Sequence, residues 1–281
     1  NDYLLIQDAD LGIVRAERSR NTSFRDSAQW YSQKLPTRLC PAFPGKLRSD
    51  CAYLQVAENP FLPEEKSQWQ DWCQSVFDIQ VEGLKRRLQA INACPVIGIS
   101  GGLDSTLALL VAAKAADYLG LERSCITAVT MPCFGTTDRT YNNACELTRR
   151  LGAQLKEVDI KNAVRVHFAD IGQDENNHDV TFENAQARER TQVLMDIANQ
   201  LGGMVIGTGD MSELALGWAT YNGDHMSMYG VNAGIPKTLV KELVRWFAIN
   251  SENEKVQAIL FDIVATPISP ELMPGDDNGN I

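Results

Sequence analysis

Residues 96–105, VIGISGGLDS, combine an apolar run, a glycine pair and two serines in a pattern suited to holding a phosphate group. Glycines allow a tight turn in which backbone N–H groups approach a ligand, and the N-terminus of a following helix adds donors and a partial positive charge. Ser100 and Ser105 can add hydroxyl donors. The stretch lacks the lysine of a Walker A loop and the three spaced glycines of a dinucleotide fingerprint. A glycine pair alone would equally suit a plain turn between a strand and a helix.

Asp104 favours the phosphate interpretation over the plain turn. A carboxylate beside an anion site is repulsive unless a cation lies between them, which indicates Mg²⁺ bridging to phosphate oxygens. With this residue, Ser-Gly-Gly-x-Asp-Ser after a strand resembles the pyrophosphate-binding loop of the N-type ATP pyrophosphatases. The resemblance implies that ATP is cleaved between its α- and β-phosphates. The loop residues that it implies bind ATP are Gly98, Ile99, Ser100, Gly101, Gly102, Leu103, Asp104 and Ser105.

Residues 181–246 contain three unusual pieces in order, TFENAQARER, GTGDMSELALGWATYNGD and IPKT. This run resembles NAD synthetase, and the glutamine-dependent kind most closely. The resemblance implies that Thr208 and Lys237 also contact ATP and that Lys237 is catalytic together with Asp104. It further implies that Asp104 and Glu213 hold Mg²⁺. The deamido-NAD site that it implies comprises Asn184, Arg188, Glu213, Trp218, Ala219, Thr220, Tyr221 and Asp224.

The chemistry of these side chains agrees with such roles. The guanidinium of Arg188 can pair with a carboxylate or phosphate in a bidentate way, although arginines on helices often only face solvent. Trp218 and Tyr221 offer flat surfaces to a ring, although aromatic residues more often belong to a core. Lys237 follows a proline and could reach a phosphate as a point charge.

The resemblance implies an ATP-dependent amidation in two steps. The nicotinate carboxylate of deamido-NAD attacks the α-phosphorus of ATP, giving an adenylated intermediate and pyrophosphate. Ammonia then displaces AMP to give NAD. In the glutamine-dependent kind, a nitrilase-like glutaminase domain of the same chain supplies this ammonia. The alternatives are another ATP pyrophosphatase, such as GMP synthetase or a tRNA-thiolating enzyme, and an inactive nucleotide-binding module.

Strands and helices alternate after residue 94, which predicts an α/β fold: a doubly wound parallel sheet with helices on both faces. We expect strands within 95–99, 125–132, 154–160 and 204–209, and helices over 103–119, 138–151 and 181–201. A further helix should begin near Pro63 and pack through a single stripe. The members of this stripe are Trp69, Trp72, Val76, Ile79, Leu84 and Leu88.

We expect two parts in the chain. Residues 1–58 should be the tail of a glutaminase domain with a linker: strand-like pieces within 2–14, a polar irregular segment over 15–35, and a proline-rich loop over 36–50. Residues 59–281 should be the synthetase domain, truncated at its C-terminus. Because the Glu-Lys-Cys chemistry of a glutaminase would lie upstream, we expect this chain to use free ammonia.

Composition excludes several classes of function. The net charge of −10 opposes general binding to nucleic acid, and the absence of an apolar run long enough to span a bilayer opposes a membrane protein. Seven scattered cysteines without CxxC spacing favour reduced thiols in the cytoplasm over a zinc site or a disulfide framework. Cys133 is the residue most easily mistaken for a nucleophile, and we expect it to be a loop residue. The resemblance further implies a homodimer or a larger homo-oligomer.

Overall fold

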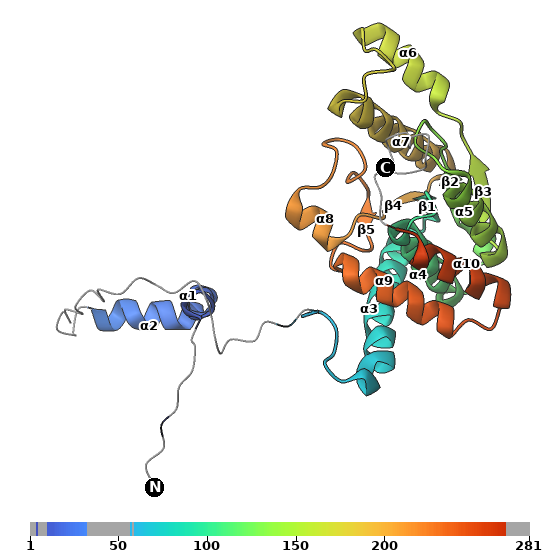
Figure 1. The fold of residues 1–281 in the computed structure, drawn as a ribbon. Coiled ribbons are helices and arrows are strands. Elements are labelled where there is room, and N and C mark those ends of the chain that lie inside the picture. Colours follow the sequence, from blue (N-terminus) through green and yellow to red (C-terminus); the bar gives the residue numbers. More distant parts are fainter. Residues whose placement is uncertain (1–3, 5–9, 33–56, 58, 268–281) are drawn as a thin grey trace. The chain divides into compact units, whose positions relative to one another are not determined.

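The computed structural model describes residues 4, 10–32, 57 and 59–267 and divides the chain into two units, Asn1–Glu58 and Asn59–Ile281. In the first unit, α1 spans Leu11–Arg20 and α2 spans Thr22–Ser32 (Figure 1). The expectations of strand over 11–14 and of irregular structure from residue 15 to Ser32 are therefore wrong. The rest of the strand-like stretch and the proline-rich loop fall almost wholly outside the described residues.

Local capping explains these two helices. Asp10 Oδ1 accepts from Gly12 N at 2.7 Å, and Asn21 Oδ1 accepts from Phe24 N at 3.0 Å. A side chain that accepts such N–H groups stabilises a helix start without tertiary contacts, whereas a strand needs a paired neighbour. The described side chains of both helices are exposed, in agreement with an origin in local interactions.

The second unit is built on a parallel sheet of five strands in the order β3-β2-β1-β4-β5. Its strands are β1 (Pro95–Gly98), β2 (Thr127–Thr130), β3 (Gln154–Glu157), β4 (Met204–Gly207) and β5 (Tyr229–Gly230). Val96 pairs with Thr127 of β2 on one side and with Val205 of β4 on the other. The chain order therefore reverses between β1 and β4, and in such sheets ligands bind beyond the carboxyl ends of the strands at the reversal.

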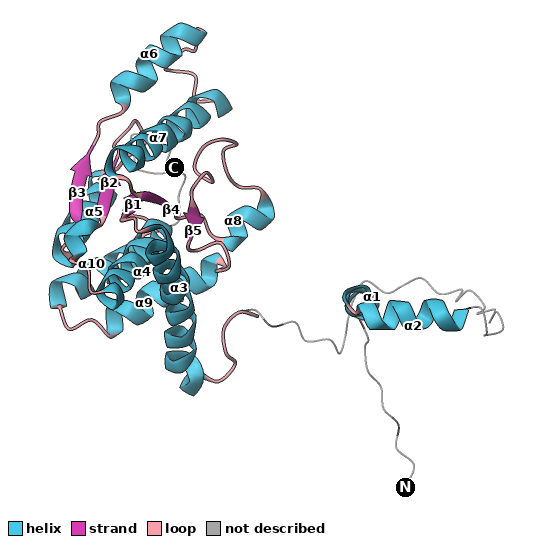
Figure 2. Ribbon diagram, turned by 180° about the vertical axis from the view of Figure 1, so that it is seen from behind, coloured by secondary structure: helices cyan, strands magenta, loops and turns pink. Residues whose placement is uncertain are grey.

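Helices cover both faces of this sheet, which confirms the predicted fold class (Figures 1 and 2). One face packs against α3 (Trp69–Ile91), α4 (Leu103–Leu119), α5 (Asp138–Leu151), α9 (Lys237–Ile249) and α10 (Glu254–Ala265). The other face packs against α6 (Lys161–Ile171) and α7 (Val180–Leu201). The remaining elements are α8 (Met211–Leu216) and two 3₁₀ turns, η1 (Lys66–Gln68) and η2 (Arg123–Cys125). Strand residues alternate between the two cores, as Val96 and Ile97 do.

The predicted helices that flank the central strands are confirmed, and glycines end them. Gly120, Gly152 and Gly202 lie directly after α4, α5 and α7 with positive φ angles. A residue without a Cβ adopts this conformation at little cost, which makes such helix ends readable from sequence. Helix α6 was not expected, although it contributes Val164 and Phe168 to the second core.

The stripe predicted for the first helix of this unit is partly wrong. Helix α3 begins at Trp69, after η1, and buries Leu84 and Leu88 as expected. Trp72 and Ile79 are exposed instead, because the apolar residues of α3 spread around more of the helix than the face that packs against the rest of the unit. The packed face also includes Cys73, Phe77, Gln80 and Val81.

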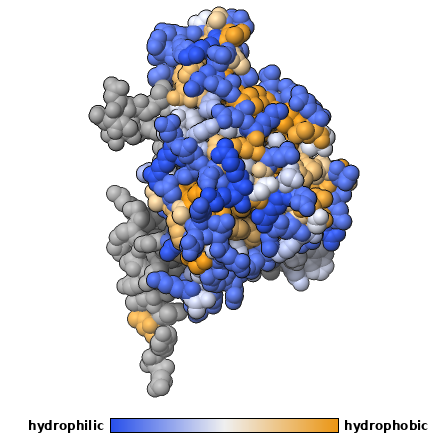
Figure 3. All heavy atoms as spheres, turned by 90° about the vertical axis from the view of Figure 1, so that its right-hand side faces the viewer, coloured by the Kyte–Doolittle hydropathy of each residue, from blue (hydrophilic) through white to orange (hydrophobic). Residues whose placement is uncertain are grey.

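None of the helices in the described ranges is long and apolar enough to cross a bilayer. Hydrophilic and hydrophobic side chains are interspersed on the face seen in Figure 3. Scattered apolar side chains of this kind are ordinary on a protein surface.

Two leucine-sized positions on α3 test the packing. Leu84 is fully buried and Ile79 is 73% exposed. Leu84→Ala should lower the free energy of unfolding by about 2–5 kcal/mol, because it removes core contacts and leaves a cavity. Ile79→Ala should change it by about 0.5 kcal/mol or less. Urea denaturation measures both, and similar losses for the two variants would contradict the packing of α3.

Candidate active site

The glycine loop lies between β1 and α4, at the carboxyl end of a central strand. Gly101 has a φ of +85°, and a Cβ there would collide with the backbone carbonyl of Thr140. Gly102 N donates to Ser100 Oγ at 3.2 Å, and Ser100 N donates to Ser105 Oγ at 3.3 Å. No side chain caps the start of α4 at Gly102, and backbone N–H groups at such a helix start suit an anion.

A second turn joins β4 to α8 at the carboxyl end of the neighbouring strand. Asp210 is fully buried and begins α8 through a reciprocal capping box with Glu213. Glu213 N donates to Asp210 Oδ1 at 2.9 Å, and Asp210 N donates to Glu213 Oε2 at 3.1 Å. The two carboxylates are thereby fixed relative to each other.

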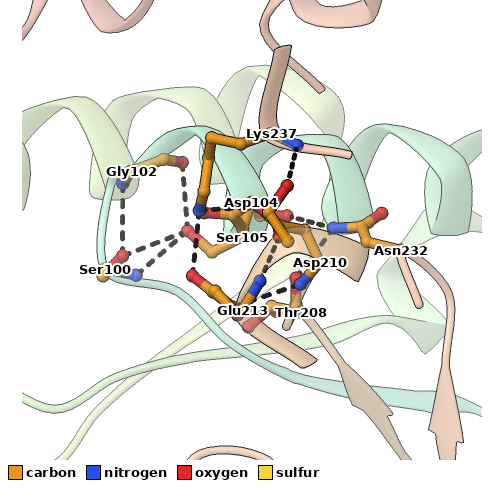
Figure 4. Close-up of polar contacts among 10 residues, drawn as sticks. Ser100, Gly102, Asp104, Ser105, Thr208, Asp210, Glu213, Asn232 and Lys237 are labelled. Carbon is orange, nitrogen blue, oxygen red and sulfur yellow. Dashed lines mark hydrogen bonds and ion pairs between the residues drawn. The ribbon is translucent and has the colours of Figure 1, made fainter. Parts of the chain in front are cut away.

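Lys237, the first residue of α9, joins the two turns (Figure 4). Its Nζ lies 2.6 Å from Asp104 Oδ2, 2.8 Å from Asp210 Oδ2 and 2.9 Å from Glu213 Oε1. The backbone of Lys237 is held as well, because its N–H donates to Ser212 Oγ at 3.0 Å. We call Asp104, Asp210, Glu213 and Lys237 the ion cluster.

Burial controls the electrostatics of the ion cluster. Burial raises the pKa of the Asp104 carboxyl to about 7, although the hydrogen bond from Lys237 acts in the opposite direction. Repulsion from Glu213 and Asp210 adds to this increase. For Lys237, burial disfavours the charge, but hydrogen bonds to the three carboxylates outweigh it and raise the pKa of the ammonium above its ordinary value. One ammonium thus faces three acidic groups.

The ion cluster fits a divalent cation. One oxygen from each of Asp104, Asp210 and Glu213 lies within 4.8 Å of the others. Asp104 Oδ1 is buried without a hydrogen-bond partner. Carboxylate oxygens are the ligands that Mg²⁺ prefers, and a buried oxygen without a partner is costly unless a cation or donor reaches it.

The residues predicted to bind deamido-NAD form a second group, on α7 and the segment after α8. Thr220 Oγ1 donates to Asn184 Oδ1 at 2.8 Å, and Thr220 N donates to Asp224 Oδ1 at 2.7 Å. Arg188 Nε donates to the carbonyl of Tyr221 at 3.2 Å. The side chains of Trp218 and Tyr221 are 77% and 75% exposed, and Ala219 is exposed between Trp218 and the buried Thr220. Of the residues predicted for this site, Glu213 lies in the ion cluster instead.

Two residues at the site were missed by sequence reasoning. Asp210 had a local signal, because Asp-x-x-Glu before a helix is a capping-box pattern. Asn232 had none: its Nδ2 donates to the carbonyls of Asp104 and Thr208, each at 2.9 Å. Thr208 itself lies at the end of β4, where its backbone oxygen accepts this bond.

A family model and several curated proteins match this chain, and all of them are described as NAD synthases or NAD(+) synthetases. The model of the family described as NAD synthase matches residues 76–257, which include the glycine loop and the ion cluster. The chain is 44% identical to the glutamine-dependent NAD(+) synthetase of Mycobacterium leprae over an alignment of 290 positions that covers 98% of this chain and 42% of that protein. It is 30% identical to that of Thermotoga maritima over an alignment of 250 positions that covers 87% of this chain and 40% of that protein. The chain thus spans about two fifths of the length of these curated relatives.

Solved structures agree with the fold. The glutamine-dependent NAD+ synthetase of Acinetobacter baumannii, in complex with ADP, superposes with a TM-score of 0.63 at 26% identity. That match covers 77% of this chain and 38% of the other. The NMN synthetase of Francisella tularensis superposes with a TM-score of 0.59 at 26% identity, covering 73% of this chain and 80% of the other.

The glycine loop can be tested with a pair of alanine substitutions. Gly101→Ala should weaken binding of inorganic pyrophosphate and ATP by at least about tenfold, or about 1.4 kcal/mol, because the new Cβ collides with the Thr140 carbonyl. Gly120 also has a positive φ but no atom within 4 Å of a built Cβ. Gly120→Ala should therefore cost about 1–2 kcal/mol of stability and leave binding unchanged. Isothermal titration measures the binding, and unaltered affinity in Gly101→Ala would argue against the loop as an anion site.

Proposed function

The chain belongs to the NAD synthase family, and on that basis we propose that it is the synthetase part of a glutamine-dependent NAD synthetase. It would convert deamido-NAD to NAD with ATP, releasing AMP and pyrophosphate through an adenylated nicotinate. The observation that carries the proposal is the ion cluster beside the glycine loop, where the chain order of the sheet reverses. The family match makes GMP synthesis and an inactive nucleotide-binding module less suitable explanations.

The residues of the chain divide the work of adenylation. The loop from Gly98 to Ser105 would hold the phosphates of ATP through backbone N–H groups and serine hydroxyls. Asp104 and Glu213, with Asp210 beside them, would hold Mg²⁺, which neutralises phosphate charge when bound. Lys237 supplies a second positive charge at the same place. Positioning and charge neutralisation of this kind are the main sources of catalysis in phosphoryl and nucleotidyl transfer.

The group around Thr220 would hold deamido-NAD. Hydrogen bonds fix Asn184 and Arg188 on α7 to the segment that carries Thr220 and Tyr221. The exposed rings of Trp218 and Tyr221 offer flat apolar surfaces, and the guanidinium of Arg188 suits a phosphate or carboxylate. The segment with Trp218, Thr220 and Tyr221 comes directly after α8, the helix that carries Glu213. Substrate and ATP sites would thus share one short stretch of chain.

Ammonia would come from a glutaminase domain of the same protein. Two facts support this source. The curated glutamine-dependent relatives are more than twice as long as the chain, and nearly all of the chain aligns with them. We assign Asn1–Glu58 to the tail of that domain with a linker, and 59–281 to the synthetase domain. Burial raises the pKa of the thiols of Cys73, Cys125 and Cys133, which does not suit a nucleophile. A cytoplasmic homodimer or larger homo-oligomer completes the proposal.

An assay with ammonium as the nitrogen source tests the synthetase activity. With ATP, Mg²⁺ and deamido-NAD, ammonium chloride should support formation of NAD and AMP. Nicotinate mononucleotide in place of deamido-NAD would distinguish NAD synthesis from NMN synthesis. Asp104→Ala should lower turnover by at least about a hundredfold, or 2.7 kcal/mol. Asp117→Ala, at the other end of α4, should not, since Asp117 pairs with Arg123 away from the loop. Absence of NAD formation with ammonium, or undiminished turnover in Asp104→Ala, would overturn the assignment.

The cation site has a test that does not depend on turnover. Lys237→Met removes the positive charge from among three carboxylates. Without metal, the variant should melt several degrees below the unsubstituted chain. MgCl₂ should raise the melting temperature of the variant more than that of the unsubstituted chain, because the ion binds only the folded state and no longer competes with the ammonium of Lys237 for the carboxylates. Lys85→Met removes a pair with Glu82 and a contact with the Tyr118 ring, neither of which involves the ion cluster, and serves as the control. Equal magnesium shifts in all three proteins would count against the site.

A further inference from the structure

Asn232 occupies a central place between the two turns of the site. It lies two residues after the end of β5 and is fully buried. Its Nδ2 donates to the carbonyl of Asp104, in the first turn of α4, and to the carbonyl of Thr208, at the end of β4. A single amide thus joins the carboxyl ends of the two strands between which the chain order reverses (Figure 4).

The other atoms of this amide are also engaged. Asn232 Oδ1 accepts from Gln80 Nε2 of α3 at 3.1 Å, and the same Gln80 nitrogen donates to the carbonyl of Val231 at 3.0 Å. Both N–H donors of Asn232 face carbonyl oxygens, and its oxygen faces a donor. If the amide were turned over, its oxygen would face two carbonyl oxygens and its N–H groups would face a donor, so only one orientation of the amide fits.

The backbone around Asn232 leads directly to Lys237. The carbonyl of Asn232 accepts from Ile235 N at 2.9 Å, and the carbonyl of Ile235 accepts from Met211 N, the first residue of α8, at 2.9 Å. Pro236 and Lys237 follow at once. The segment that Asn232 anchors thus delivers the ammonium of the ion cluster and holds the start of the helix that carries Glu213.

From these contacts we propose that Asn232 is a positioning residue for MgATP binding, with Gln80 as its support. It sets the spacing between Asp104, the β4–α8 turn and Lys237, the three pieces of chain that carry the ion cluster. Its contacts involve neither Asn184 nor Arg188, so it acts on the ATP site and not on the deamido-NAD site. The inference rests on the proposed function for the identity of the ligands.

Asn232→Asp is the direct test. The substitution keeps the size of the side chain but places a carboxylate oxygen against two carbonyls. Measured by isothermal titration on the 281-residue chain, the Kd of MgATP should rise about tenfold, because small displacements of catalytic groups have large effects. The Kd of deamido-NAD should change by less than about twofold. Steady-state assays with ammonium should show the same split between the two KM values.

Matched variants keep the test decisive. Asn250→Asp makes the same chemical change at an exposed asparagine that donates to the carbonyl of Trp246, and both Kd values should stay as they are. If Asn232→Asp does not fold, Gln80→Met removes the donor to Asn232 Oδ1 and to the neighbouring carbonyl of Val231, and should raise the Kd of MgATP by about threefold.

An unchanged MgATP Kd in the folded Asn232→Asp variant, or in Gln80→Met where Asn232→Asp does not fold, would overturn the proposal. Equal losses for both ligands would do so too, because a merely structural role affects both. A chain that binds MgATP but makes no NAD would refute the proposed function and still allow the role of Asn232 to be tested through the MgATP Kd.

Discussion

The ion pair network around Lys237 is the interaction on which the site depends. Removing charges from water costs several kcal/mol for each ion, and mutual attraction compensates only when the geometry is good and other hydrogen bonds are satisfied. Here the four charged groups come from α4, from the β4–α8 turn with α8, and from α9. They meet only if all three pieces of chain are docked correctly. Burial is the main cause of the raised pKa of Asp104, and the negative charge that remains beside Lys237 suits the cluster to a cation.

The parallel sheet solves this docking problem. Its order places β1 beside β4, so the glycine loop and the β4–α8 turn leave neighbouring strands at the same edge. The capping box then fixes Asp210 against Glu213, and Asn232, two residues after β5, donates to the carbonyls of Asp104 and Thr208. The capping box uses N–H groups at the start of α8 that would otherwise lack partners, and Asn232 binds backbone carbonyls of both turns. The same bonds that complete the secondary structure therefore also set the spacing of the charged groups.

The sequence predicted most of the second unit because its signals are local and agree with one another. Short apolar strands, helices closed by glycines and turns between them recur from residue 94 onward. The predictions fail where the pattern in the sequence is weak or fits more than one structure. Helices α1 and α2 depend on caps at Asp10 and Asn21 within polar sequence, which was interpreted as irregular. On α3, the apolar residues span more of the helix than its neighbours can cover, so Trp72 and Ile79 remain exposed.

By itself the sequence determined a glycine turn between a strand and a helix, with Ser100, Asp104 and Ser105 in it, and a family pattern that includes Glu213 and Lys237. These features are readable because residue type and short spacing are sufficient to define a loop after a strand. Only the tertiary structure decided that Lys237 lies among three carboxylates and that Asn232 connects two strand ends. Asp104 and Asn232 are 128 positions apart, and no local pattern encodes a hydrogen bond between them. Such contacts follow from which strands are neighbours in the sheet, and packing of the whole unit sets that order.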